Sequence, residues 1–162
     1  MVSTKMQDAL NRQINAELYS SYLYLSMAAW MESANLSGCA QWMRVQSREE
    51  HSHAMKLFDY LVACDARVVL DAIDEPPLKW KSALDVFSAT LTHEKKVTAA
   101  IAALMSAAVA EKDYATQGLL QWFVNEQVEE EASALRIVDV LKMIGDSAQG
   151  LIMLDRELAQ RK

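Results

Sequence analysis

The sequence is poor in the two residues that most often interrupt regular structure, with four glycines and two prolines among 162 residues. Because glycine and proline end or bend helices, their scarcity favours a few long helices. Long apolar runs are absent as well, since no segment approaches the roughly 20 apolar residues of a membrane-spanning helix. The N-terminal stretch MVSTKMQDALNRQ has no apolar core of the signal-peptide kind. These absences predict a cytoplasmic protein with no membrane partner.

Cysteine and positive charge are also scarce. The two cysteines, Cys39 and Cys64, fall in one predicted helix, where their 25-residue separation spans about 38 Å. That distance is too large for a disulfide within the helix, so we expect free thiols buried as small side chains in a reducing compartment. The net charge of −6 argues against nucleic acid as the main partner and suits a cationic ligand.

The residues that are present suffice for one domain covering residues 1–162. Hydrophobic residues make up 52% of the chain, enough for a sizeable core. The motif TKMQ, Thr4 to Gln7, has the spacing of a capping box, and Gly145 is a typical helix stop. The apolar periodicity predicts four long helices and a short fifth one, at residues 4–32, 36–64, 82–111, 114–144 and 147–160.

Loop lengths predict how these helices are arranged. Short turns join the first helix to the second and the third to the fourth, so each pair should form an antiparallel hairpin. About 17 residues, including Pro76 and Pro77, separate the second helix from the third. That connection is long enough to run the length of a bundle, which would make the second and third helices parallel. The predicted fold is an all-α four-helix bundle with one long crossover and a short fifth helix.

Each long helix has an apolar stripe that is interrupted near its middle by an acid. The four acids are Glu17, Glu50, Glu94 and Glu130, and the second helix adds His53. Carboxylates buried together repel one another and lose hydration, and protonation or a hard cation relieves that cost. Four carboxylates and one imidazole suit a pair of first-row metal ions, iron above all, better than a zinc–thiolate or an all-oxygen calcium site.

The spacing of these residues indicates two related hairpins. Glu17 and Glu50 are 33 residues apart, and so are Glu94 and Gln127. The second member of the first pair begins a Glu-x-x-His motif, whereas the second member of the other pair begins Gln-x-x-Glu. The predicted site is therefore asymmetric, with one of two equivalent Glu-x-x-His motifs lost.

Several polar residues near this level allow two interpretations. The acidic segment NEQVEEE, residues 125–131, forms either a solvated face or, together with Glu49, a third cation position. Tyr24 is either a core aromatic residue or a hydroxyl donor to one of the carboxylates. His51 and His93 are interpreted as surface or flanking residues.

These motifs resemble those of the bacterial non-haem ferritins. The segments that carry the resemblance are NAELYSSYLYLSMAAW, REEHSHAMKLFDYL, the dipeptide HE at 93–94, and QWFVNEQVEEE. The resemblance covers essentially all 162 residues, including the crossover and the short fifth helix. It implies a ferritin-like fold and a hollow cage of 24 identical subunits. It also implies oxidation of Fe(II) by O₂ or H₂O₂ and storage of Fe(III) as a hydrous oxide mineral.

The resemblance also implies roles for individual residues. Glu17, Glu50 and His53 would hold a first iron, and Glu50 would bridge to a second iron held also by Glu94 and Glu130. Tyr24 matches a tyrosine beside the iron site, and Gln127 matches a glutamine that lines it. The acids that match the family's third iron site are Glu49, Glu126, Glu129 and Glu130.

Related proteins fit the sequence less well. Bacterioferritins carry the second Glu-x-x-His motif and a haem-ligating methionine where this chain has His51, so no haem is expected. The DNA-protecting miniferritins place their ligands differently and often carry a basic tail, whereas this N-terminus has only Lys5 and Arg12. Two rival functions remain: an acidic helical interaction protein, and a di-iron oxygenase or peroxidase of the rubrerythrin type, whose rubredoxin-like cysteine pairs are missing.

Overall fold

The computed structural model describes residues 2–162 and contains five helices. All five predicted helices are present, and their ends lie within two residues of the predicted ones. No strand occurs in the described part of the chain. The helices are α1 (Thr4–Ser33), α2 (Ser37–Ala63), α3 (Ala83–Ala110), α4 (Tyr114–Ile144) and α5 (Ala148–Leu158).

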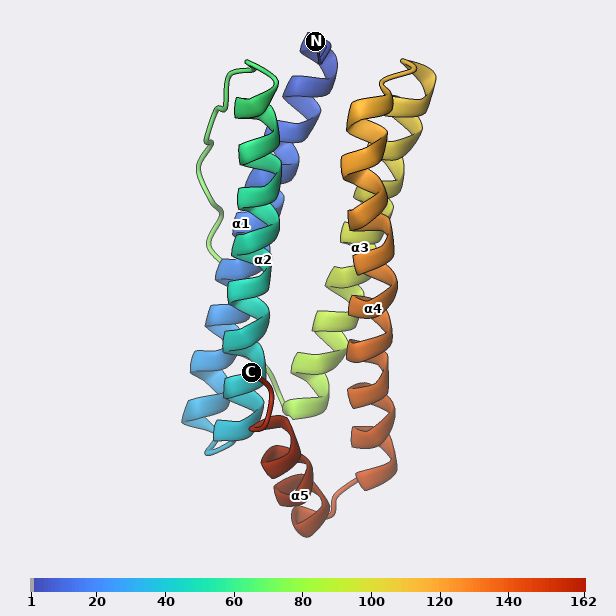
Figure 1. The fold of residues 1–162 in the computed structure, drawn as a ribbon. Helices are drawn as coiled ribbons and strands as arrows, with labels where there is room; N and C mark the ends of the chain where they lie inside the picture. Colours follow the sequence, from blue (N-terminus) through green and yellow to red (C-terminus); the bar gives the residue numbers. More distant parts are fainter. Residues whose placement is uncertain (1) are drawn as a thin grey trace.

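The four long helices form two antiparallel hairpins joined by the long crossover (Figure 1). The crossover runs along the bundle, so α2 and α3 are parallel, as the loop lengths predicted. Side chains of α1 hold it in place: the Asn11 amide donates to the carbonyl of Arg67 at 3.1 Å, and the Ser26 hydroxyl donates to that of Pro77 at 2.7 Å. The crossover is therefore an ordered strap along the first hairpin.

The ends of the helices follow local rules with one correction. The predicted capping box at TKMQ is wrong by one residue, because Ser3 rather than Thr4 caps α1 and accepts from the Met6 amide at 3.1 Å. Both residues have hydroxyls, so sequence spacing alone did not distinguish them. Gly145 ends α4 as predicted, with a positive φ of 55° that favours glycine.

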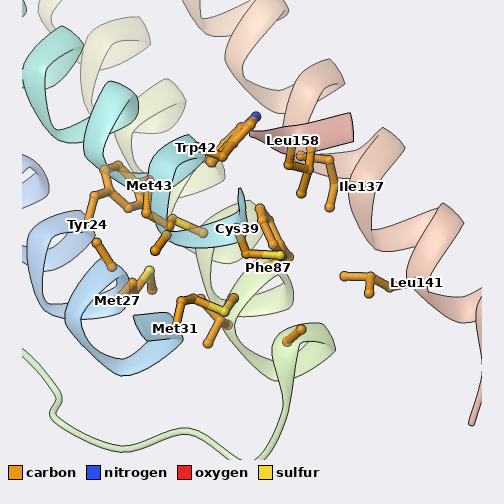
Figure 2. Close-up of a cluster of buried hydrophobic side chains, with 14 of the residues drawn as sticks. Tyr24, Met27, Met31, Cys39, Trp42, Met43, Phe87, Ile137, Leu141 and Leu158 are labelled. Carbon is orange, nitrogen blue, oxygen red and sulfur yellow. The ribbon is translucent and has the colours of Figure 1, made fainter. Parts of the chain in front are cut away.

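The core consists of two hydrophobic clusters. The cluster nearer α5 is drawn in Figure 2 and includes Tyr24, Met31, Trp42, Phe87 and Ile137. The second cluster, toward the other end of the bundle, includes Leu10, Ile14, Leu57, Ile101 and Phe123. The interrupting acids lie between the two clusters, so apolar packing closes the predicted site from both ends.

Helix α5 packs against the beginning of α2. The Asp155 carboxylate accepts a hydrogen bond from the Cys39 amide at 2.8 Å, which caps α2 from a distant part of the chain. A Cβ at Gly38 would lie 1.7 Å from the Asp155 carbonyl oxygen, so this close approach requires glycine. Helix α5 is thus firmly joined to α2.

Both cysteines are free thiols, as predicted. Cys39 is fully buried, whereas Cys64 is only partly buried. Within residues 2–162, no helix combines the length and the apolar character that crossing a membrane would require.

Candidate metal centre

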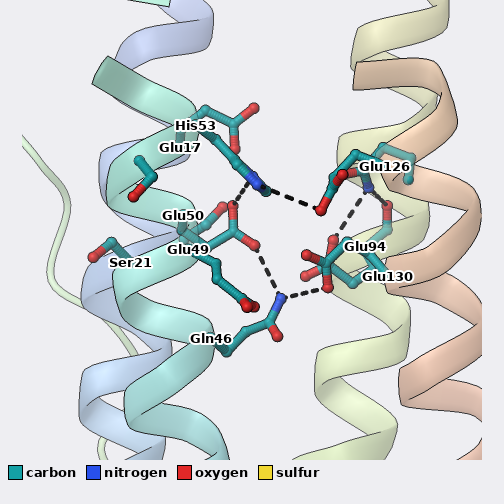
Figure 3. Close-up of polar contacts among 12 residues, drawn as sticks. Glu17, Ser21, Gln46, Glu49, Glu50, His53, Glu94, Glu126 and Glu130 are labelled. Carbon is teal, nitrogen blue, oxygen red and sulfur yellow. Dashed lines mark hydrogen bonds and ion pairs between the residues drawn. The ribbon is translucent and has the colours of Figure 1, made fainter. Parts of the chain in front are cut away.

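Each long helix carries its acid into the interior of the bundle. Glu17 lies on α1, Glu50 and His53 on α2, Glu94 on α3 and Glu130 on α4, and their exposed fractions are between 1% and 5%. Figure 3 shows the side chains of the first hairpin facing those of the second. The apolar stripes thus bring the five predicted residues together at one level.

These residues form two candidate ligand groups that share one carboxylate. Glu17, Glu50 and His53 make the first group, and Glu50, Glu94 and Glu130 make the second. Within each group, one donor atom from every residue lies within 4.8 Å of the others. The arrangement offers two adjacent cation positions with Glu50 between them.

A third group lies beside the first two and is more open. It consists of His53, Glu126 and Glu130, and the Glu126 side chain is 31% exposed. His53 Nε2 lies 4.0 Å from a Glu126 carboxylate oxygen. This group uses two of the four acids that the resemblance assigned to a third iron.

The other two acids of that assignment are placed differently. Glu49 is paired with Arg161, and Glu129 is exposed to solvent. Neither belongs to a candidate ligand group in the described residues. Their part in a third iron site stays a prediction.

Glutamine side chains orient several of the acids. Gln13 donates to Glu17 at 2.8 Å, and Gln46 donates to Glu50 at 3.2 Å and to Glu130 at 2.6 Å. The sequence prediction assigned no role to either glutamine. A signal was available, because each lies four residues before an acid on the same helix and shares its face.

Glu94 receives donors from both hairpins. The Tyr24 hydroxyl donates to one Glu94 oxygen, and the Gln127 amide donates to the other at 3.2 Å. Tyr24 is fully buried. Its hydroxyl therefore reaches a carboxylate, which decides between the two interpretations of this tyrosine.

The acids are held in an environment that disfavours negative charge. Burial is the largest cause and raises the pKa of Glu17 and Glu50 well above the ordinary value, with repulsion from neighbouring carboxylates adding to it. Burial likewise raises the pKa of Glu94, and it raises that of Glu130 to about 7. Glu17 Oε2 is buried without a hydrogen-bond partner. An oxygen left in this state fits a cation ligand, as does the mixed carboxylate–imidazole set.

The remaining histidines lie outside the candidate ligand groups. His51 is exposed, as predicted. His93 flanks the site, where its Nε2 lies 2.7 Å from the Ser20 hydroxyl and its ring meets that of Tyr24 edge to face. Burial, assisted by the charge of Lys96, lowers the pKa of His93 to about 4.

A carboxylate–histidine cluster at the centre of a four-helix bundle with one long crossover defines the ferritin-like class of proteins. The sequence matches the family model of the ferritin-like domain over residues 7–144. It is 46% identical over 161 residues to a bacterial non-heme ferritin of Bacteroides fragilis (strain 638R), covering 99% of this chain and 100% of that protein. It is 41% identical over 156 residues to that of Campylobacter jejuni, covering 96% and 93%.

Comparison with solved structures also points to ferritins. The crystal structure of an open pore ferritin from the hyperthermophilic archaeon Archaeoglobus fulgidus matches with a TM-score of 0.99 at 53% identity, covering 99% of this chain and 98% of that chain. The chain therefore belongs to the ferritin family of iron-storage proteins. The resemblance seen in its sequence motifs is confirmed.

Proposed function

We propose that the chain binds two Fe(II) ions per subunit inside the bundle, oxidises them with O₂ or H₂O₂, and delivers Fe(III) to a hydrous oxide mineral. The observation that carries this proposal is that two groups of buried donor atoms share Glu50. A shared carboxylate holds two ions side by side, which is the arrangement that two-metal chemistry needs.

In this proposal each position has its own ligands. Glu17, Glu50 and His53 bind the first Fe(II), and Glu50, Glu94 and Glu130 bind the second. Oxygen and imidazole nitrogen are ligands suited to iron. Four carboxylates stabilise two Fe(III) ions more than two Fe(II) ions, because the attraction grows with cation charge.

Paired ions allow oxygen to be reduced without a one-electron step. Two Fe(II) ions give up one electron each, and O₂ takes both electrons and two protons to form H₂O₂. With H₂O₂ as the oxidant, the same two electrons and two protons yield two water molecules. Tyr24 and Gln127 serve this site by holding Glu94 through hydrogen bonds to its two oxygens.

The asymmetry of the centre suits storage better than retention of the metals. Glu130 of the second position also belongs to the more open group with His53 and Glu126, so Fe(III) held there should have a path toward the mineral. The neighbouring His53, Glu126 and Glu130 group supports a third iron position on that route, with Glu49 and Glu129 as additional acids. The proposal includes no haem.

The proposed assembly is a homo-oligomeric cage of 24 subunits in the cytoplasm. Large apolar side chains on the surface support association, among them Leu70, Leu78, Met143 and Met153, which are 62% to 79% exposed. Light scattering should give about 440 kDa, which is 24 times the 18.2 kDa chain. A monomer at all concentrations would contradict the cage.

Iron titration with a size measurement tests the function against its rivals. Fe(II) added in air should give a fast ferric absorbance that saturates at about two irons per subunit. Further iron should then form a dense core inside particles of constant outer size. Oxidation no faster than in buffer would leave an interaction protein, and a fixed metal content without mineral would favour a rubrerythrin-type enzyme.

A further inference from the structure

The segment after α5 returns to α2 and brings a positive charge beside the metal centre. Gln41 donates to the Arg161 carbonyl at 3.3 Å, and the guanidinium lies over the Trp42 ring, 4.2 Å from its centroid. The same guanidinium pairs with Glu49 and donates to Gln46 Oε1 at 2.8 Å. Arg161 thus contacts successive turns of α2 on the side of the site.

The contact with Gln46 determines which way its amide points. A glutamine side chain has an accepting oxygen at one end and a donating NH₂ group at the other, whereas arginine only donates. With Oε1 held by Arg161, Nε2 faces Glu50 at 3.2 Å and Glu130 at 2.6 Å. The reverse orientation would set NH₂ against the guanidinium and the oxygen against two carboxylates. Gln46 is fully buried, so water cannot relieve either clash.

We propose that Arg161 is a positioning residue of the metal centre, which acts by locking Gln46 as a clamp between Glu50 on α2 and Glu130 on α4. The clamp contacts Glu50 Oε1 and Glu130 Oε2 and so fixes the direction of both carboxylates, while Glu50 Oε2 faces His53 Nδ1 at 3.3 Å within the first ligand group. This inference rests on the proposed function and adds a residue far from the ligands in the sequence.

The anchoring of α5 explains how a residue beyond the helix can act on the site. The Asp155 contacts with Gly38 and Cys39 join α5 to the start of α2, and the chain then runs along α2 to Arg161. Helix α5 also carries an exposed ion pair, in which Glu157 meets Arg136 of α4 at 3.0 Å. That pair holds the same helix without touching the centre, so it supplies a matched control.

The test compares three variants of the 162-residue chain: Arg161→Ala, Arg161→Lys and the control Arg136→Ala. The first readout is Zn²⁺ binding by calorimetry, since this ion does not change its oxidation state, and the second is the rate of the fast ferric phase. Loss of a group that orients a metal ligand costs about 10–100-fold. We expect Arg161→Ala to weaken Zn²⁺ binding and slow oxidation by about tenfold. Arg136→Ala should stay within about twofold of the original protein.

Arg161→Lys should give an intermediate result. An ammonium group can donate to Gln46 Oε1, but it lacks the fork that reaches Glu49 at the same time. This variant keeps the charge and most of the apolar stem, so it guards against a folding defect in the alanine variant. Melting temperatures of all variants provide the check on folding.

A double-mutant cycle separates positioning from general stabilisation of α5. If Arg161 acts through Gln46, then Arg161→Ala should change Zn²⁺ affinity by less than about twofold once Gln46→Leu is present. Losses that simply add would overturn the inference, as would an Arg161→Ala protein that binds and oxidises like the original. Failure of the original protein to bind Zn²⁺ and oxidise Fe(II) would instead overturn the proposed function, and this inference with it.

Discussion

The two hairpins contribute unequal halves to one centre. Hairpin α1–α2 supplies two acids and an imidazole, whereas hairpin α3–α4 supplies two acids and no imidazole. Both acids of the first hairpin also have a glutamine four residues earlier, Gln13 before Glu17 and Gln46 before Glu50. The 33-residue spacing therefore relates whole donor–acid pairs in the first hairpin, not single residues.

Among residues 2–162, the second hairpin has no such donor four residues before its acids, and its one internal donor is Gln127, which reaches Glu94 from α4 at 3.2 Å. Thr90 and Phe123 occupy the positions four residues before Glu94 and Gln127. Thr90 donates to its own helix backbone at 3.1 Å instead of to an acid. Both acids of the second hairpin also take a donor from the first: Glu94 from Tyr24 and Glu130 from Gln46. The comparison teaches that each acid of the first hairpin has a donor on its own helix, whereas the acids of the second hairpin are held partly from the first.

Removing the shared carboxylate should produce the largest effect. Glu50 belongs to both ligand groups, so Glu50→Ala removes a ligand from both metal positions. The rate of the fast ferric phase should fall by about 100-fold or more, which is at or above the upper end of the range for losing a group that only orients a ligand. Stopped-flow absorbance measures this rate. Glu129→Ala is the control, since Glu129 is exposed and should affect only stoichiometry or later turnover. Equal losses from the two substitutions would count against a shared bridge.

Much of this centre was predictable from the sequence, because burial and helix periodicity together fix which residues share a level. Glu17 and Glu94 interrupt stripes that are otherwise apolar, and a buried acid of this kind needs polar partners, a proton or a cation beside it. Arg161 was not predictable. It lies beyond the last helix, and its position depends on the close approach of Gly38 to Asp155. Helix periodicity in the sequence does not predict such a contact. The orientation of Gln46 follows from Arg161 and was missed with it.

Metal binding should stabilise the protein in a pH-dependent way. The pKa of Glu130 is raised by burial to about 7, so the folded metal-free state binds an extra proton between the ordinary value of 4.5 and about 7. The contribution of this proton to the free energy of unfolding is fully present below pH 4.5 and is lost as the pH rises through 7. A cation replaces the proton, so a hundredfold excess over the dissociation constant should add about 2.7 kcal/mol above pH 7 and much less near pH 5.

Calorimetry with Zn²⁺ at the two pH values measures this increment. Glu94→Gln should reduce it, since one ligand of the second position is gone. The same change should leave the metal-free protein no less stable, because it removes one of the repelling acids. An increment that stays unchanged in Glu94→Gln would remove Glu94 from the site.

Making the hairpins alike should sharpen the comparison. The double substitution Gln127→Glu and Glu130→His recreates the Glu-x-x-His motif in α4 without changing the number of acids. We expect the second position to hold a divalent ion such as Fe(II) or Zn²⁺ about tenfold more tightly, since imidazole suits these ions better than carboxylate does. Mineral growth after the first two irons should slow. The measurement is the amount of metal that the protein retains when a chelator is added. Loss of metal as rapid as in the original protein would contradict the claim that the asymmetric centre favours release of iron to the mineral.

The smallest effect should come from loosening one acid within the first hairpin. Gln13→Leu removes the donor 2.8 Å from Glu17 Oε1, and the other oxygen of Glu17 already lacks a partner. The metal-free acid should then favour its protonated form more strongly, because the hydrogen bond from Gln13, which favours the charged form, is gone. Gln13 holds an acid of one ligand group, whereas Gln46 holds Glu50, which belongs to two. Zn²⁺ affinity should therefore fall by no more than about tenfold, the lower end of the range for losing a group that orients a metal ligand. The loss should be smaller than in Gln46→Leu. Equal losses of Zn²⁺ affinity in the two variants would mean that the hydrogen bond from Gln46 to Glu130 of the second hairpin adds nothing to metal binding.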